Sequence, residues 1–115
     1  MLANAPRGRA IVEMPRRTLG RLWREDYRET DLHYRTYAKF LLTKHVKLGG
    51  DVAKAKPAYA ILLAKIDRAA EEYERSLWLY ETDRSDAIPP NPITYPLWMH
   101  LDLDAFGVEL EGLRA

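Results

Sequence analysis

The chain has 115 residues, of which 47% are hydrophobic and 30% are charged, and its formal net charge is +1. This length supports one domain with a modest core, and the composition is too apolar for a disordered chain. The absence of cysteine excludes a disulfide framework and a thiolate zinc site.

No apolar run approaches the roughly 20 residues that span a bilayer. Residues 1–9 lack the continuous apolar stretch of a secretory signal. We therefore expect a cytoplasmic protein, or one inside a virion, and no membrane partner.

The small net charge hides an asymmetry between the two ends of the chain. Residues 1–50 contain 11 Lys and Arg against 5 Asp and Glu, whereas residues 51–115 contain 7 against 12. Such halves can attract each other within one chain or between neighbouring copies. The alternative is that two solvated faces merely differ in charge, because exposed ion pairs are individually weak.

Residues 1–15 are expected to form an irregular N-terminal arm, and two helices are expected to follow, at about 16–28 and 32–48. Thr30 or Asp31 can cap the second of these helices, and Gly49-Gly50 can end it. Its apolar stripe has helical spacing and consists of Tyr34, Tyr37, Ala38, Leu41, His45 and Leu48.

Asp51 can cap the next segment, where Pro57 predicts a short turn at 52–56 followed by a long helix at 57–82. One face of that helix repeats every three and four residues through Tyr59, Leu63, Ile66, Ala70, Tyr73, Leu77 and Tyr80. This seam can pack on helix 32–48 in an antiparallel hairpin, or it can pair with another copy. We favour the hairpin, because the loop between the two helices is short.

Residues 87–98 read A-I-P-P-N-P-I-T-Y-P-L-W, which cannot be helical yet is too apolar to be left in water. Proline-rich chain is already extended, so fixing it against a surface costs little entropy. We expect it to lie on the apolar end of the long helix or on a neighbouring subunit. The expected interface residues are Tyr73, Leu77, Trp78, Leu79, Tyr80, Ile88, Ile93, Tyr95, Leu97 and Trp98.

Residues 100–113 alternate between apolar and polar side chains, which predicts a short β-like tail. Its polar face would carry His100, Asp102 and Asp104, a set that could ligate a divalent metal. A solvated polar face explains the same pattern more simply, so we expect no metal and no cofactor. No nucleophile elbow, phosphate-binding loop or zinc-protease motif occurs, so an enzyme is not expected.

A cluster of arginines near the N-terminus suggests an alternative partner, because guanidinium groups suit phosphate oxygens. It consists of Arg7, Arg9, Arg16, Arg17, Arg21 and Arg24. Four acidic residues follow between positions 25 and 31, and the whole chain is nearly neutral, which disfavours a dedicated nucleic-acid domain. The cluster could equally meet an acidic protein surface.

Four runs, L-W-R-E-D-Y, Y-R-T-Y-A-K-F, G-G-D and K-P-A-Y-A-I-L-L-A-K-I, are similar to the helical core of some phage small terminase subunits. That resemblance implies an oligomeric DNA-recognition protein of a viral packaging motor. The characteristic C-terminal ending of that family is absent here, and no functional residue is carried over.

The sequence thus predicts a mainly α fold, an antiparallel helical hairpin or small bundle with an extended Pro-rich segment and a β-like tail. We divide it into an arm (1–15), a helical core (16–82) and an extended tail (83–115). The expected function is a non-enzymatic assembly or adaptor subunit of a larger, repetitive complex, viral or phage-like, that binds other subunits and copies of itself. The alternative is a small oligomeric DNA-binding protein.

Overall fold

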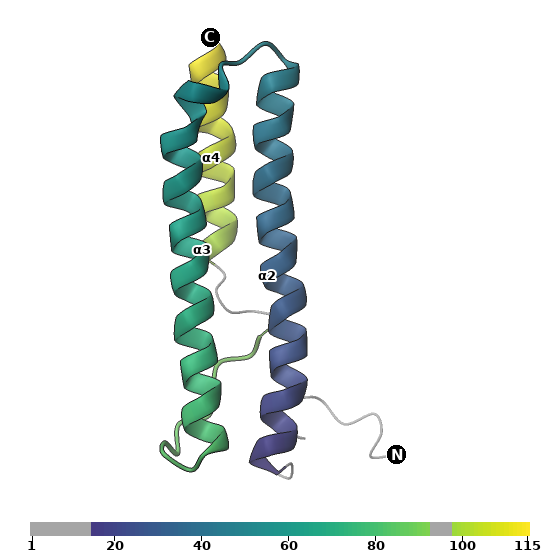
Figure 1. Ribbon diagram of the computed structural model, residues 1–115, viewed down its shortest axis with the longest axis vertical. Coiled ribbons are helices and arrows are strands. Elements are labelled where there is room, and N and C mark those ends of the chain that lie inside the picture. The colour runs from purple at the N-terminus through teal and green to yellow at the C-terminus, as the bar shows by residue number, and fades with distance from the viewer. Residues whose placement is uncertain (1–14, 93–97) are drawn as a thin grey trace.

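The structure, a computed structural model, describes residues 15–92 and 98–115. These residues form three helices, α2 (Arg16–Lys47), α3 (Val52–Glu81) and α4 (Trp98–Arg114). Helices α2 and α3 run antiparallel, and α4 lies beside the part of the pair that is nearest the α2–α3 turn (Figure 1). The molecule is elongated, 54 × 32 × 17 Å. The predicted mainly α hairpin or small bundle is confirmed.

One helix, α2, replaces the two that were predicted at 16–28 and 32–48. The expected caps make other bonds inside the helix: the Thr30 hydroxyl donates to the carbonyl of Asp26, and the Asp31 carboxylate accepts from Arg35. Both are bonds between residues four positions apart, which a continuous helix provides. The predicted break is therefore wrong.

Helix α3 begins at Val52, so the predicted turn at 52–56 is also wrong. The predicted cap is confirmed, because the Asp51 side chain accepts from the backbone N–H of Ala53 at 2.9 Å. Pro57 lies in the second turn of the helix. Because proline has no backbone N–H, the carbonyl of Ala53 loses its hydrogen-bond donor, and no other carbonyl is affected in this way. Ala53 is exposed, so water can take the place of that donor.

Residues 98–114 form a helix, and the predicted β-like tail is wrong there. The short alternation H-L-D-L-D belongs to a longer pattern with helical spacing, in which the fully or nearly buried residues are Met99, Leu103, Phe106 and Leu110. Gly107 lies inside α4 and faces the side chain of Leu41.

Two separate cores hold the helices together. In the part that we call the three-helix half, residues from all three helices form one cluster: Tyr34, Ala38, Ala55, Leu62, Ile66, Ala69, Met99, Leu103, Phe106 and Leu110. In the two-helix half, at the start of α2 and the end of α3, the cluster is Leu19, Trp23, Tyr27, Tyr73, Leu77 and Tyr80.

The Pro-rich segment partly covers the two-helix half. Pro89 and Pro92 are buried, and the Tyr73 hydroxyl donates to the carbonyl of Pro90 at 2.7 Å. Residues 83–92 run back along the helix pair below α4 (Figure 1). The hydrogen bond to Pro90 therefore holds this chain beside the two-helix half, whereas α4 lies beside the other half.

The predicted seam of α3 packs within the chain. Ile66, Tyr73, Leu77 and Tyr80 are buried, while the other three seam residues, Tyr59, Leu63 and Ala70, are half-buried. A second row of α3, Leu62 and Ala69, is buried as well. The buried strip is wider than a two-helix seam because α3 contacts both α2 and α4.

Candidate protein-binding surface

The residues predicted to form an interface have different surroundings. Tyr73, Leu77 and Tyr80 are buried in the core of the two-helix half, where the Tyr27 and Tyr73 rings stack with centroids 4.4 Å apart. Leu79 is half-buried, and Ile88 is 52% exposed. Ile93, Tyr95 and Leu97 lie outside the described residues, and Trp98 begins α4. Their role in an interface stays a prediction.

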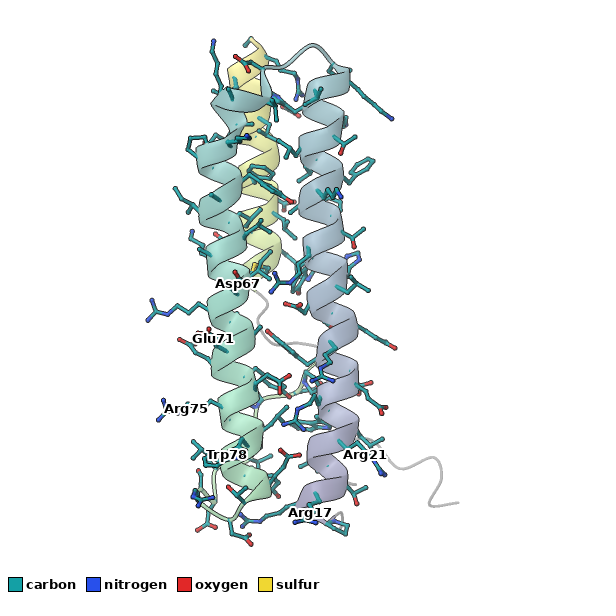
Figure 2. All side chains as sticks on the ribbon, viewed as in Figure 1. Arg17, Arg21, Asp67, Glu71, Arg75 and Trp78 are labelled. Carbon is teal, nitrogen blue, oxygen red and sulfur yellow. The ribbon has the colours of Figure 1, made fainter. Side chains whose placement is uncertain are left out.

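Among the members of this set whose side chains are described, Trp78 is an exposed aromatic residue, at 49% exposure. The Arg84 guanidinium lies over its ring, 4.7 Å from the centroid. Figure 2 shows Trp78 in a row with Asp67, Glu71 and Arg75 on α3. Charged side chains therefore follow Trp78 along this side of α3.

Two of the predicted nucleic-acid arginines are engaged inside the chain. Arg16 donates to the carbonyls of Tyr80 and Ser85 and to the carboxylate of Asp86. The hydrogen bond to Asp86 raises the pKa of Arg16. Arg16 thereby fastens the loop that follows α3 to the start of α2.

Arg24 makes the strongest ionic contact of the two-helix half. Its two terminal nitrogens donate to the two carboxylate oxygens of Glu81 at 3.0 and 2.8 Å, and its Nε donates to Glu74 at 2.6 Å. These bonds, that to Glu81 first, raise the pKa of Arg24. A Cβ atom on Gly20 would overlap the Glu81 side chain, so a glycine near the start of α2 leaves the room that this carboxylate occupies.

Arg17 and Arg21 are exposed and have no ion pair among the described residues. Both lie near the start of α2 (Figure 2), where they line an open hollow with Glu81, Thr82 and Asp83. Arg7 and Arg9 lie outside the described residues. The free arginines therefore stand beside carboxylates, which weakens their attraction for phosphate.

The three residues considered as metal ligands do not converge. The Tyr34 hydroxyl lies 3.1 Å from Nε2 of His100, and Asp102 lies 3.8 Å from the Lys65 ammonium, whereas Asp104 is exposed. Burial raises the pKa of Tyr34. No group of three or more His, Asp and Glu side chains able to hold a metal ion occurs in residues 15–92 and 98–115.

The most exposed large apolar side chains among the described residues lie on α4, on the side away from the core. Leu101 is 72% exposed and Val108 is 68% exposed, and Ala105 and Gly112 between and beyond them are also exposed. These four residues, which we call the α4 outer face, follow one another at intervals of four, three and four positions. This spacing places them in one row along the helix.

Carboxylates border the α4 outer face on both sides. From the helical periodicity, Asp104 and Glu111 lie on one side of the row and Asp102 and Glu109 on the other. On the second side the apolar surface continues into a groove of about 230 Å³ between α3 and α4. Ile61, which is 59% exposed, stands on the α3 wall of this groove.

The sequence contained a signal for this face that the alternating pattern obscured. Counted at intervals of three and four, residues 99–112 show two apolar rows rather than one. The row that starts at Met99 is buried, and the row that starts at Leu101 is exposed. The spacing alone shows both rows, and the structure shows which of them packs on the other helices.

Comparisons with protein-family models, curated proteins and solved structures find no match for this chain, so the resemblance to phage small terminase subunits gains no support. No helix in the described part of the chain is both long enough and apolar enough to cross a membrane.

Proposed function

We propose that this protein is a non-enzymatic assembly or adaptor subunit, which binds a neighbouring protein in a larger, repetitive complex through the α4 outer face. The observation that carries the proposal is the exposure of Leu101 and Val108, 72% and 68%, on a helix whose opposite side is already buried.

The physical argument starts from what a peripheral helix normally shows to water. A helix that packs on one side has polar residues on its other side. An apolar row with a charged rim is instead typical of a protein-binding surface, because the row gains free energy on burial while the rim stays hydrated. The three-and-four spacing suits a helix as the partner.

The carboxylates bordering the row set the chemistry of that partner. Asp104, Glu109 and Glu111 are exposed and have no ion pair among the described residues. An acidic partner would be repelled by them, whereas a basic one would be attracted and oriented. We therefore infer a partner that presents an apolar helix face with basic neighbours.

For nucleic-acid binding, the alternative function, fewer arginines are free to bind phosphate than the predicted cluster contains. Of the four described arginines in the predicted cluster, Arg17 and Arg21 are free of ion pairs among described residues, whereas Arg16 and Arg24 hold the helices together. Two exposed cations beside Asp83 and Glu81 provide a weak phosphate site.

The test uses the absence of cysteine from the chain. A single thiol is introduced by Val108→Cys on the α4 outer face, and a matched control is introduced by Arg75→Cys on the charged side of α3. The alkylation rate of each thiol is measured in dilute purified protein and in the intact cells that naturally make the protein.

We expect the thiol at position 108 to react at least about tenfold more slowly in cells than in dilute solution, because a bound partner excludes the reagent. The thiol at position 75 should react at similar rates in both. Equal reactivity of position 108 in the two settings would contradict an assembly role for this face.

A further inference from the structure

We propose that the partner of the α4 outer face is helix α2 of a second copy of this chain, which inserts its own exposed row of side chains. This inference rests on the proposed function and names the partner. The row, which we call the α2 outer row, consists of His33, Tyr37, Phe40, Lys44 and Lys47.

The α2 outer row has the periodicity that a helix–helix contact requires. Its members follow one another at intervals of four, three, four and three, and all are exposed. The three rings form a continuous ladder, because centroid distances are 6.4 Å from His33 to Tyr37 and 6.2 Å from Tyr37 to Phe40. Phe40 is 57% exposed, so a large apolar knob projects from the helix.

The α4 outer face has the complementary shape. Its small residues, Ala105 and Gly112, alternate with the larger Leu101 and Val108. A Cβ atom on Gly112 would meet nothing within 4 Å, so the surface there is open. Small residues between larger ones leave recesses that can receive rings from a facing helix.

The charges are complementary as well. No acidic residue occurs between Asp31 and Asp51, and the lysines in that stretch, Lys39, Lys44 and Lys47, have no ion pair among the described residues. Across the contact, Asp104, Glu109 and Glu111 have no ion pair within the described part either. The contact therefore brings together charges of opposite sign that one copy leaves unmatched.

Charge also argues against the simplest symmetric arrangement. If two α4 outer faces met, Asp102, Asp104, Glu109 and Glu111 of one copy would face the same four residues of the other. Like charges that face each other across a contact repel. A contact between α4 and α2 joins two different surfaces, so each copy can bind one neighbour on each side. Such contacts close into a ring or continue as a filament, which is the repetitive assembly proposed above.

Two double variants separate the surfaces. Leu101→Glu with Val108→Glu disables the α4 outer face, and Phe40→Glu with Lys44→Glu disables the α2 outer row. The matched control is Trp78→Glu, which removes an exposed aromatic residue from the other side of α3 (49% exposed). All these positions are exposed, and circular dichroism checks that helicity is kept.

Molar mass is measured by light scattering as the concentration of full-length protein is raised. We expect the wild type and the Trp78→Glu control to form assemblies of more than one copy. Each double variant alone should be monomeric. An equimolar mixture of the two double variants should give a dimer and nothing larger, because one intact α4 outer face meets one intact α2 outer row.

Several results would overturn this inference. The first is a mixture of the two double variants that stays monomeric. The second is a symmetric dimer of the wild type that only the α4 variant loses. The third is assembly that is abolished by deleting residues 1–14 but kept in the α2 variant. A wild type that is monomeric at every concentration would overturn it too. If position 108 is nevertheless protected in cells, the proposed function stands and the partner is a different protein; if it is unprotected there, both proposals fail.

Discussion

The two halves of the α2–α3 pair have cores made of different kinds of side chain. In the three-helix half, α2 and α3 contribute the small side chains Ala38, Ala55 and Ala69 beside larger ones such as Ile66, and α4 adds four further large side chains. In the two-helix half, where residues 15–92 and 98–115 place no third helix beside the pair, the large rings of Trp23, Tyr27, Tyr73 and Tyr80 form most of the core. Small residues allow a third helix to approach closely, whereas rings give two helices enough apolar contact on their own.

The halves also differ in their polar contacts. The two-helix half is bordered by Arg16 and Arg24, which bind carboxylates and carbonyls from the end of α3 and the loop after it. In the three-helix half, Arg35 pairs with Asp67 at 2.7 Å between α2 and α3, and Lys65 contacts Asp102 at 3.8 Å between α3 and α4. Both halves thus have ionic contacts of their own, but only the three-helix half includes the α4 outer face, an unpartnered apolar row that is exposed to solvent. This contrast is why we place the partner on the three-helix half.

The largest expected effect comes from breaking the core of the three-helix half. Ile66 is 1% exposed and lies in the cluster built from all three helices. Ile66→Asp buries an unpaired carboxylate, and we expect a loss of at least about 4 kcal/mol, close to the whole stability of a small domain. Circular dichroism and urea denaturation measure it.

Ile61→Asp is the control for this substitution, because Ile61 lies on the same helix at 59% exposure. It should change stability by no more than about 0.5 kcal/mol. Native helicity and unchanged stability in Ile66→Asp would mean that this cluster does not hold the fold.

The pairing of α2 with α3 could be predicted from the sequence because it follows from local signals. Asp51 supplies a side-chain cap, and Gly49 adopts a φ of 90° at the turn, a geometry that favours glycine. The three-and-four spacing of the seam then places apolar residues between the helices. Each of these signals lies within a few residues of the element that it specifies.

Other features depended on contacts that are distant in sequence. Thr30 and Asp31 have the residue types of a helix cap, and only the continuous packing of α2 on α3 decides that they lie inside a helix. The five-residue alternation at 100–104 is compatible with both strand and helix. Nor can the sequence show which arginines lack an ion pair, because the two carboxylates that bind Arg24 lie 50 and 57 positions away along the chain.

A smaller effect is expected from opening the ionic contacts of the two-helix half. Arg24→Met removes the cation between Glu74 and Glu81, while keeping most of the apolar stem. We expect a loss of about 2 kcal/mol, because both carboxylates then lack their charged partner in a partly buried site. The free energy of unfolding in urea is the measurement.

Arg21→Met is the matched control on the same helix, since Arg21 is exposed and has no ion pair among the described residues. Its stability should stay within about 0.5 kcal/mol of the wild type. Equal effects of the two substitutions would show that the contacts of Arg24 with Glu74 and Glu81 do not stabilise this half, and that its aromatic core suffices.

The smallest effect concerns the Pro-rich segment, which lies beside the two-helix half. Tyr73→Phe keeps the ring that stacks on Tyr27 and removes the hydroxyl that donates to the carbonyl of Pro90. We expect a loss of about 1 kcal/mol in urea denaturation, the usual contribution of one neutral hydrogen bond. Tyr37→Phe should cost less, because the Tyr37 hydroxyl has no hydrogen bond within the described residues. If both substitutions cost the same, the Tyr73–Pro90 bond does not hold the segment in place. The two-helix half would then depend on its rings and arginines alone, and its surface beneath the segment would be a second candidate for binding a neighbour.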